Sequence, residues 1–294
     1  MNGVLWGLCG AILIGASDCI ARVTARQVSS SLLFLFIMGL SLAVLTLWDI
    51  TTGEWPPWHL WAWTASAMSG VLNLVALYFL YQALARGPVA VASPAASSFT
   101  VLLVLLNIVA GEPWSLLQIG AMALVFLGIV MLTRPTAADN GSTHVDAKWL
   151  RITVFYALAA AFAVSFRMFL AQEAGEIVGA FHALYLNRLF ALTGSVLLVA
   201  YLILRNHSLS WPTGSLRGLV LLQAIFETGA LAAFLIGSSS GGRISASIGF
   251  AAFAAATALF ARIWLKELIG WHRAWWIFIV GVGVLLAVAG SPTA

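Results

Sequence analysis

Five ionisable side chains stand inside long apolar stretches of this sequence: Asp18, Arg167, Arg188, Glu227 and Arg262. In an apolar solvent such as a bilayer, each costs roughly 2.5 to 3.5 kcal/mol, so each needs a partner or a purpose. Glu227 lies in the segment QAIFETGAL, with no basic residue within one helical turn. Its partner must therefore come from another segment.

Glu227 and Arg188 are predicted to pair. Each lies about ten residues from the same end of its own apolar stretch, so their depths match at about 1.5 Å per residue. The pair could fix helix packing. It could also be functional, with Glu227 as a proton-coupling carboxylate or as the anchor of a substrate amine. Both alternatives stay open.

The other three ionisable residues have local explanations. Arg262 lies near the end of its stretch and can extend its guanidinium to the interface. Asp18 precedes a basic residue by one turn, and it is predicted either to pair with that residue or to serve as a proton site. Arg167 lies one turn from the predicted outer end of its stretch, where it is expected to form an outer gate with Glu173 or Glu176.

Polar and aromatic side chains form a second group of candidates. Asn73, Tyr78, Tyr81 and Gln82 cover one broad arc of a predicted helix, and that arc cannot all face lipid. Such groups either hydrogen-bond to neighbouring helices or line a wet cavity. The aromatic side chains that could stack beside them are Trp6, Phe99, Tyr156, Tyr185 and Phe250.

Backbone features form a third group. Pro94 lies inside a predicted span and predicts a kink there. The stretch 238–242, with Ser245, Ser247 and Gly249 after it, offers hydroxyls at a helix start that could hold a substrate carboxylate. Gly249 is also a candidate gating or kink residue. The same small residues could simply allow close helix packing, so both interpretations stay open.

Apolar membrane helices must position these residues. Of the 294 residues, 62% are hydrophobic and 8% are charged, against about 25% charged in a soluble domain, which excludes a water-soluble fold. The formal charge of +4 is scattered, so no nucleic-acid partner is expected. Ten stretches can cross a bilayer: Gly3 to Ala21, Leu32 to Trp48, Leu60 to Ala85, Val89 to Ala110, Trp114 to Leu132, Ile152 to Ala171, Gly179 to Leu204, Leu216 to Ile236, Ile244 to Trp264 and Trp271 to Gly290.

The flanking charges predict the orientation. If ten spans alternate, the flanking Lys and Arg residues gather on one side and Arg243 stands alone on the other. This predicts a multi-pass protein of a bacterial cytoplasmic (inner) membrane with both termini outside. The predicted outer loops hold five acidic residues, namely Asp49, Glu54, Glu112, Glu173 and Glu176.

An internal repeat divides the chain. Three pairs of positions share one shift of 155 residues: Gly87 with Gly242, Glu112 with Glu267, and Gly128 with Gly283. The predicted domains are a first five-helix repeat at 1–133, a cytoplasmic linker at 134–150 and a second repeat at 151–294. Because five is odd, the two all-α repeats would be inverted, an arrangement typical of transporters with a midplane site.

Short motifs stand at Trp6-Gly7, Tyr81-Gln82-Ala83-Leu84, Gly87-Pro88-Val89-Ala90 and Gly111-Glu112. Together with the ten spans in two repeats, they resemble the EamA-type drug/metabolite transporter superfamily. The resemblance implies a ten-helix exporter of small organic metabolites whose third, fourth, eighth and ninth helices line a central cavity. Many members of that superfamily have the N-terminus inside, whereas the charges here predict the reverse.

The sequence therefore predicts a secondary transporter rather than an enzyme. It would export small amphipathic or zwitterionic metabolites, such as amino acids, by alternating access. No G-x-x-x-x-G-K-[ST] motif occurs, so the driving force would be a gradient, with proton exchange as one candidate. The alternatives are a multidrug or cation efflux protein of the same fold, or an intramembrane enzyme built on the serines at 238–240.

The expected partners are a small-molecule substrate and the lipid bilayer. Protons are a candidate coupling ion, and a homodimer through Gly281 and Gly283 is a further candidate. No cofactor or metal is expected, because no two histidines share a span.

Overall fold

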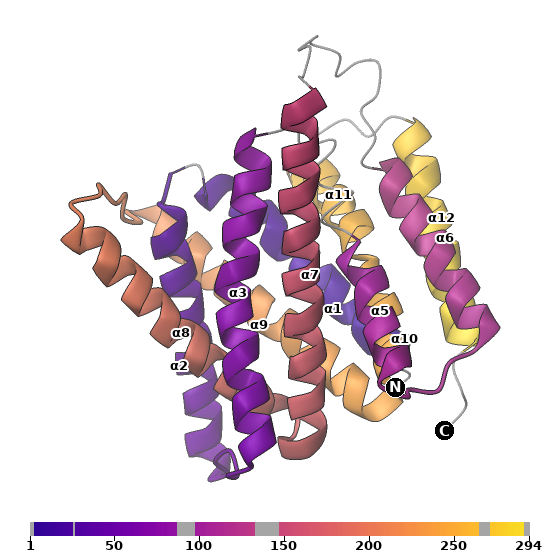
Figure 1. Cartoon of the computed structure of the whole chain (residues 1–294), viewed down its shortest axis with the longest axis horizontal. Coiled ribbons are helices and arrows are strands. Elements are labelled where there is room, and N and C mark those ends of the chain that lie inside the picture. Colours follow the sequence, from indigo (N-terminus) through magenta and orange to yellow (C-terminus); the bar gives the residue numbers. More distant parts are fainter. Residues whose placement is uncertain (1–2, 26, 87–97, 133–146, 265–270, 291–294) are drawn as a thin grey trace.

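The computed structural model of the chain describes residues 3–25, 27–86, 98–132, 147–264 and 271–290, and these residues form helices with no strand among them (Figure 1). The helices are α1 (Gly3–Thr24), α2 (Ser30–Thr52), α3 (Leu60–Arg86), α5 (Phe99–Val109), α6 (Leu116–Leu132), α7 (Ala147–Val178), α8 (Ala180–Leu204), α9 (Ser215–Gly241), α10 (Arg243–Ala251), α11 (Phe253–Trp264) and α12 (Trp271–Ala289).

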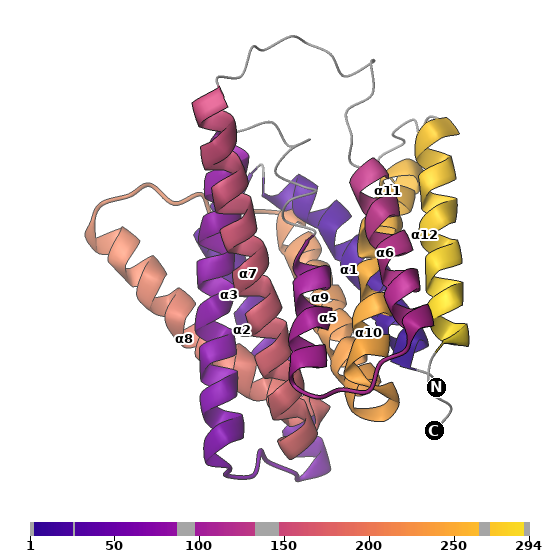
Figure 2. The ribbon, with the colours of Figure 1, turned by 45° about the vertical axis from the view of Figure 1, so that its right-hand side comes forward.

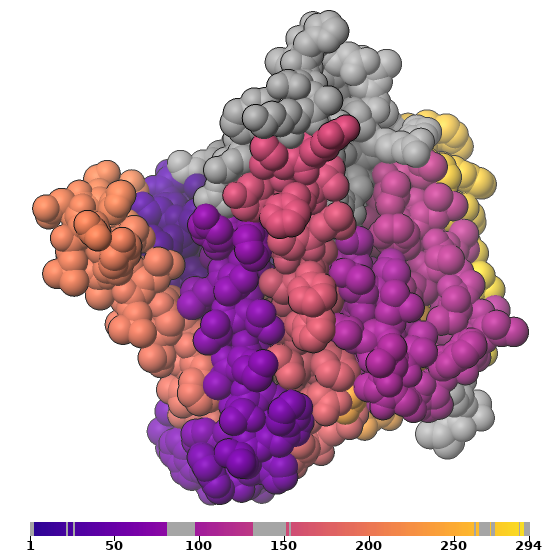
Figure 3. Space-filling view, viewed as in Figure 1, coloured from indigo at the N-terminus to yellow at the C-terminus, as the bar shows by residue number. Residues whose placement is uncertain are grey.

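The helices suit a membrane. Within the part of the chain that the structure describes, seven candidate spans are long and apolar enough to cross one, and three shorter apolar helices lie at Phe99–Val109, Leu116–Met131 and Ala274–Ala287. Figure 3 shows α3, α7 and α6 on one face of the molecule. These helices expose large apolar side chains, including Val71 (55%) on α3, Phe155 (67%) on α7 and Leu116 (81%) on α6. Such a surface is expected where hydrocarbon is the solvent. The count of ten spans stays a prediction.

The helices pack in a small set of pairs. α3 packs against α7, and α1 packs against α9, while α2 packs against α8. α6 and α12 lie side by side at one edge of the bundle (Figures 1 and 2). The start of α1 and the end of α12 lie at the same end of the bundle (Figure 1). An even number of crossings would place them so.

Two glycines bring α1 and α10 into close contact. A Cβ atom on Gly7 would collide with the carbonyl oxygen of Ala246, and a Cβ atom on Gly249 would collide with that of Val4. Gly249 therefore allows close packing and lies inside a continuous helix. The interruption between α10 and α11 lies at Ala252, three residues after Gly249, the predicted gating or kink residue.

Two further glycines join α6 to α12 by reciprocal contacts. A Cβ atom on Gly128 would approach the Cγ2 atom of Val280 to 2.6 Å, and a Cβ atom on Gly283 would approach the Cγ2 atom of Val125 to 2.6 Å. The two glycines, and likewise the two valines, are related by the repeat shift of 155 residues. The same two helices thus exchange equivalent contacts.

The helix boundaries correct three predictions. α7 begins at Ala147, inside the predicted linker, and continues beyond Ala171 to Val178. Glu173 and Glu176 therefore lie on a helix and not in an outer loop. Asp49, also expected in an outer loop, lies on α2 and is 1% exposed. Both α2 and α7 therefore continue through the acidic residues that were expected to lie in loops.

Candidate functional site

The predicted pair between α8 and α9 is present. The Nη2 atom of Arg188 donates a hydrogen bond to Oε1 of Glu227 at 3.2 Å, and the two side chains are 0% and 22% exposed. The Nη1 atom of Arg188 lies 3.0 Å from the sulfur of Met38 on α2. The amide nitrogen of Asn73 on α3 lies 3.9 Å from the same sulfur. Four helices thus meet around one buried guanidinium.

Arg167 is deeper than its sequence position suggested. It precedes the end of α7 at Val178 by eleven residues, or about 16 Å along the helix axis. It lies within electrostatic range of Arg188 and Glu227. The predicted gate of Arg167 with Glu173 or Glu176 is wrong, because the helix extends one and a half turns or more past the predicted end of the span.

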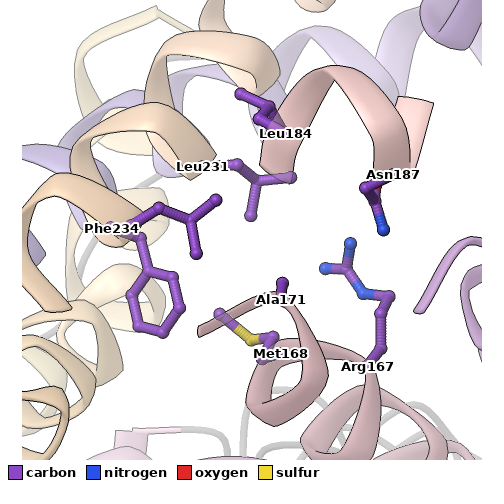
Figure 4. Close-up of a pocket in the computed structure, with 8 residues that line it drawn as sticks. Arg167, Met168, Ala171, Leu184, Asn187, Leu231 and Phe234 are labelled. Carbon is purple, nitrogen blue, oxygen red and sulfur yellow. The ribbon is translucent and has the colours of Figure 1, made fainter. Parts of the chain in front are cut away.

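Arg167 lines a small cavity between α7, α8 and α9 (Figure 4). The cavity leaves about 10 Å³ for the centre of a water molecule, which is room for roughly one water. In the predicted order these helices are the sixth, seventh and eighth spans, so only the eighth agrees with the set that the resemblance implied. The lining residues are Arg167, Met168, Ala171, Leu184, Asn187, Leu231, Phe234 and Leu235.

Asn187 is a cavity residue that the sequence analysis missed. Its Nδ2 atom donates to the Oγ atom of Ser69 at 2.7 Å, and that hydroxyl donates to the backbone carbonyl of Arg167 at 2.8 Å. The chain of contacts ties α8 to α7 through α3. The available signal was an amide side chain directly before Arg188 in an otherwise apolar segment.

An aromatic cluster adjoins the cavity. Two of the predicted stacking residues, Phe99 and Phe250, belong to the same buried cluster as Phe234 of the cavity wall. The ring centroids of Phe234 and Phe250 are 5.1 Å apart, and those of Phe99 and Phe253 are 5.7 Å apart. These rings extend the apolar side of the cavity toward α5, α10 and α11.

Three other predicted aromatic residues serve other contacts. Trp6 is half-buried and packs closely against Gly237 of α9. A Cβ atom added to Gly237 would lie 2.7 Å from the Cβ atom of Trp6. Tyr156 packs near Phe79 with ring centroids 6.0 Å apart. Tyr185 is half-buried and faces Trp55 edge-on at 6.3 Å. These three rings lie in helix contacts, and none lines the cavity.

The predicted polar arc of α3 is only partly described. Asn73 contacts Met38 of the neighbouring α2, whereas Tyr78 is 56% exposed and contacts Phe79. An exposed tyrosine can face lipid when its hydroxyl reaches the interface. The side chains of Tyr81 and Gln82 and the whole of Pro94 lie outside the described residues.

The serine-rich stretch at the end of α9 is engaged in helix contacts. Ser238, Ser239 and Ser240 each donate to a backbone carbonyl one turn earlier. Ser245 on α10 accepts a hydrogen bond from Nε2 of Gln118 at 3.0 Å. The turn itself uses Gly242, whose φ of 89° favours glycine. The packing interpretation of this stretch therefore has direct support.

Asp18 bonds across helices. Its Oδ2 atom accepts a hydrogen bond from the hydroxyl of Thr257 on α11 at 3.1 Å. The side chain of Arg22, its predicted partner, lies outside the described residues.

A second charged cluster closes the end of the bundle where α7 ends. Arg243 forms ion pairs with Glu173 and Glu176 of α7, and its Nε atom lies 3.3 Å from Oε1 of Glu112. We name these four residues the Arg243 cluster. Three carboxylates thus share one guanidinium that is 6% exposed. The sequence analysis placed Arg243 alone among acidic residues on the predicted outer side, but it did not predict that Arg243 pairs with them.

Burial dominates the electrostatics of Glu112, which lies in the loop between α5 and α6. Burial raises the pKa of the Glu112 carboxyl above its ordinary value, and the nearby Arg243 guanidinium only partly opposes this rise. Glu176 and Glu173 add to the rise by like-charge repulsion.

Neutral polar side chains fill the space between this cluster and the interior. The Oε1 atom of Gln172 accepts from Nδ2 of Asn107 at 3.0 Å, and its Nε2 atom donates to Ser238 at 2.9 Å. Gln172 is also within 3.4 Å of the Ser247 hydroxyl. The network joins α5, α7, α9 and α10 just below the Arg243 cluster. Among the residues that the structure describes, no group of His, Cys, Asp or Glu could hold a metal ion.

Comparisons with known proteins agree with this architecture. Residues 1–134 match the family model of the EamA-like transporter family, while no curated protein matches the chain. A solved structure titled "Crystal structure of protein" has a TM-score of 0.78 and 21% identity, and the match covers 97% of this chain and 96% of that one. That similarity shows a shared fold. The match over residues 1–134 confirms the resemblance read from the motifs in that part of the chain.

Proposed function

We propose that this protein is a secondary transporter that exports small amphipathic or zwitterionic metabolites, such as amino acids, by alternating access. The observation that carries the proposal is the buried Arg188–Glu227 pair, together with Arg167, at a small cavity deep among apolar helices. Ionisable residues at such depth face a substrate pathway or one another, and here they do both. The cavity admits roughly one water, so substrate entry requires α7, α8 and α9 to separate.

We also propose ten spans arranged as two inverted five-helix repeats, 1–133 and 151–294. The reciprocal glycine contacts between α6 and α12 support this symmetry, because equivalent positions contact each other in both directions. The packing of α1 on α9 has its counterpart in the packing of α7 on α3. Under the repeat, α1 corresponds to α7 and α3 to α9. Two such halves can exchange conformations around a shared site.

The Arg243 cluster is the proposed outer gate, in the role first expected for Arg167. It ties the ends of α7 and α10 to the loop before α6. Opening toward that side must separate these carboxylates from Arg243. In the proposed orientation, with both termini outside a bacterial inner membrane, this end faces outward.

Glu227 is the proposed proton-coupling residue. Its carboxylate is the only acidic partner that the structure gives Arg188 among the described residues, and it remains partly accessible. The alternative of cation efflux is disfavoured, because two guanidinium groups and one carboxylate leave excess positive charge at the cavity. Proton binding to Glu227 would weaken its bond to Arg188 and allow α8 and α9 to part.

Counterflow in proteoliposomes tests the proposal. The purified protein is reconstituted with a panel of amino acids and amphipathic drug-like compounds, and uptake of each labelled compound is measured between about pH 5 and 8. We expect the unaltered protein to exchange at least one compound at a rate that depends on pH. Glu227→Gln should either exchange that compound at a rate independent of pH or not exchange it at all. Glu54→Gln, the same change in an exposed loop, is the matched control.

Two results would contradict the proposal. Absence of exchange for the whole panel by the unaltered protein would reject export of these metabolites. An unchanged pH dependence in Glu227→Gln would reject its coupling role. A periplasm-active reporter fused at Ala294 tests the orientation separately, and an inactive fusion would place the terminus inside.

A further inference from the structure

The cavity holds more positive than negative charge. Arg167 lines it from α7, and Arg188 follows the lining residue Asn187 on α8. The carboxylate that acts on both guanidinium groups is that of Glu227. This carboxylate is bonded to Arg188 at 3.2 Å. Arg167 has no ion pair to any acidic side chain among the described residues. One guanidinium therefore faces the cavity without a counter-charge.

Unpaired polar atoms gather at the same place. The Nε atoms of Arg167 and Arg188 and the Oδ1 atom of Asn187 are buried without a hydrogen-bond partner. Asn187 and Arg188 are 2% and 0% exposed as whole residues. Buried polar groups are nearly always paired, so the unpaired atoms of Arg167 and Asn187, which both line the cavity, indicate a missing ligand. Figure 4 shows the Arg167 side chain directed into the space between α7, α8 and α9.

The remaining wall of the cavity is apolar. Beyond Arg167 and Asn187, it consists of Met168, Ala171, Leu184, Leu231, Phe234 and Leu235. The cavity admits roughly one water as it stands, so a larger ligand enters only when α7, α8 and α9 separate. A ligand that suits the wall then exposed has a hydrocarbon body and one compact anionic group. A phosphate carrying two charges would exceed the single uncompensated guanidinium, whereas a carboxylate matches both its charge and its planar fork.

We propose that Arg167 binds the carboxylate of the transported substrate, and that the substrate class is small monocarboxylates with an apolar body, including amino acids with apolar side chains. This proposal rests on the proposed transport function. Arg188 is a positioning residue, since Glu227 already neutralises it. The other candidate carboxylate site, at 238–240, is already occupied by hydrogen bonds within α9.

A paired-ligand thermal shift experiment tests this assignment. The detergent-purified protein is titrated with acetate, butanoate, hexanoate, octanoate and leucine, and in parallel with the matching uncharged amides and with leucinamide. We expect the carboxylates to raise the Tm, more strongly for longer chains, and the amides to have little effect. Arg167→Gln should weaken carboxylate binding at least about tenfold, as expected for loss of a charge-assisted bond.

Two controls separate binding from folding. Arg205→Gln makes the same chemical change at an exposed position and should leave carboxylate binding unchanged. Arg167→Lys keeps the charge but loses the planar fork, and it should retain weaker binding with the same preference for carboxylates over amides. Size-exclusion profiles report whether each variant is folded.

The possible outcomes are distinct. Equal stabilisation by acids and amides, no stabilisation by any carboxylate, or carboxylate binding that survives in folded Arg167→Gln would overturn the assignment. Counterflow with the same pairs separates it from the transport proposal. Exchange of leucinamide but not of leucine leaves transport standing and rejects the carboxylate site. Arg167-dependent binding without exchange supports the site and rejects transport.

Discussion

Arg188 on α8 donates a hydrogen bond to Glu227 on α9 across 3.2 Å, and its guanidinium is completely buried. The two helices contact each other here through a charged pair and not only through apolar side chains. A guanidinium in this position cannot reach water when its partner is lost. The pair therefore couples the stability of the bundle to the charge on one carboxylate.

We expect Glu227→Gln to destabilise the protein by about 3 kcal/mol. This is the low end for breaking a buried pair, because Glu227 is 22% exposed. The double variant Arg188→Met with Glu227→Met removes both charges and should be more stable than Glu227→Gln alone. Denaturant titration of the proteins in detergent measures the free energy of unfolding of each variant relative to the unaltered protein. A double variant that is less stable than the single one would contradict this account.

Matching depth along two spans was enough to predict this pair from the sequence. The same reasoning failed for Arg167, because it depends on where each span ends. The predicted span ends at Ala171, yet α7 continues to Val178. The helix can continue because Arg243, from a distant part of the chain, neutralises the carboxylates of its last turns. The local sequence pattern around Ala171 could not predict this contact with a distant segment.

Close packing of α1 on α10 predicts a strong effect at Gly249. The added methyl group of Gly249→Ala would collide with the Val4 carbonyl and lie 3.0 Å from the Leu8 nitrogen, so we expect a loss of roughly 1 to 3 kcal/mol. Gly281→Ala is the matched control, because nothing lies within 4 Å of the added atom. It should be neutral or stabilising by up to about 1 kcal/mol. Equal Tm changes in the two variants would refute the packing role.

The reciprocal contacts of α6 and α12 predict symmetric compensation. Gly128→Ala and Gly283→Ala should each lower the Tm, because each methyl group meets a valine on the other helix at 2.6 Å. Val280→Ala should relieve the first variant, and Val125→Ala should relieve the second in part, because the Gly283 methyl group also lies 3.1 Å from the Ala121 oxygen and 3.2 Å from the Val125 nitrogen. Thermal unfolding of the single and double variants measures both cycles. Absence of rescue in both cycles would argue against the valine contacts as the cause of the loss.

Some site residues could not be identified from one sequence. Met38 carries no charge and lies among apolar neighbours, so nothing marked it as a partner of Arg188. The amide of Asn187, directly before Arg188, did not by itself identify Ser69 as its partner. Their roles depend on which faces of α2, α3, α7 and α8 meet. The apolar pattern of a fully buried membrane helix does not specify those faces, because lipid and protein neighbours are equally apolar.

Glu112 predicts a pH dependence whose sign follows from its burial. Because its native pKa lies above the ordinary value of 4.5, the folded protein favours the protonated carboxyl. The stability that this preference contributes is fully present below about pH 4.5 and is lost as the pH rises through the higher native pKa. We therefore expect the Tm of Glu112→Gln to rise relative to that of the unaltered protein from about pH 4.5 toward neutrality.

Glu54→Gln, in the exposed loop between α2 and α3, controls for the chemical change itself. The Tm difference between each variant and the unaltered protein is measured at every pH in one buffer series. If the difference for Glu112→Gln falls as the pH rises, attraction to Arg243 outweighs burial and the predicted sign is wrong. A rising difference means instead that ionised Glu112 is held at a cost, so protonation stabilises the closed Arg243 cluster and deprotonation favours its opening.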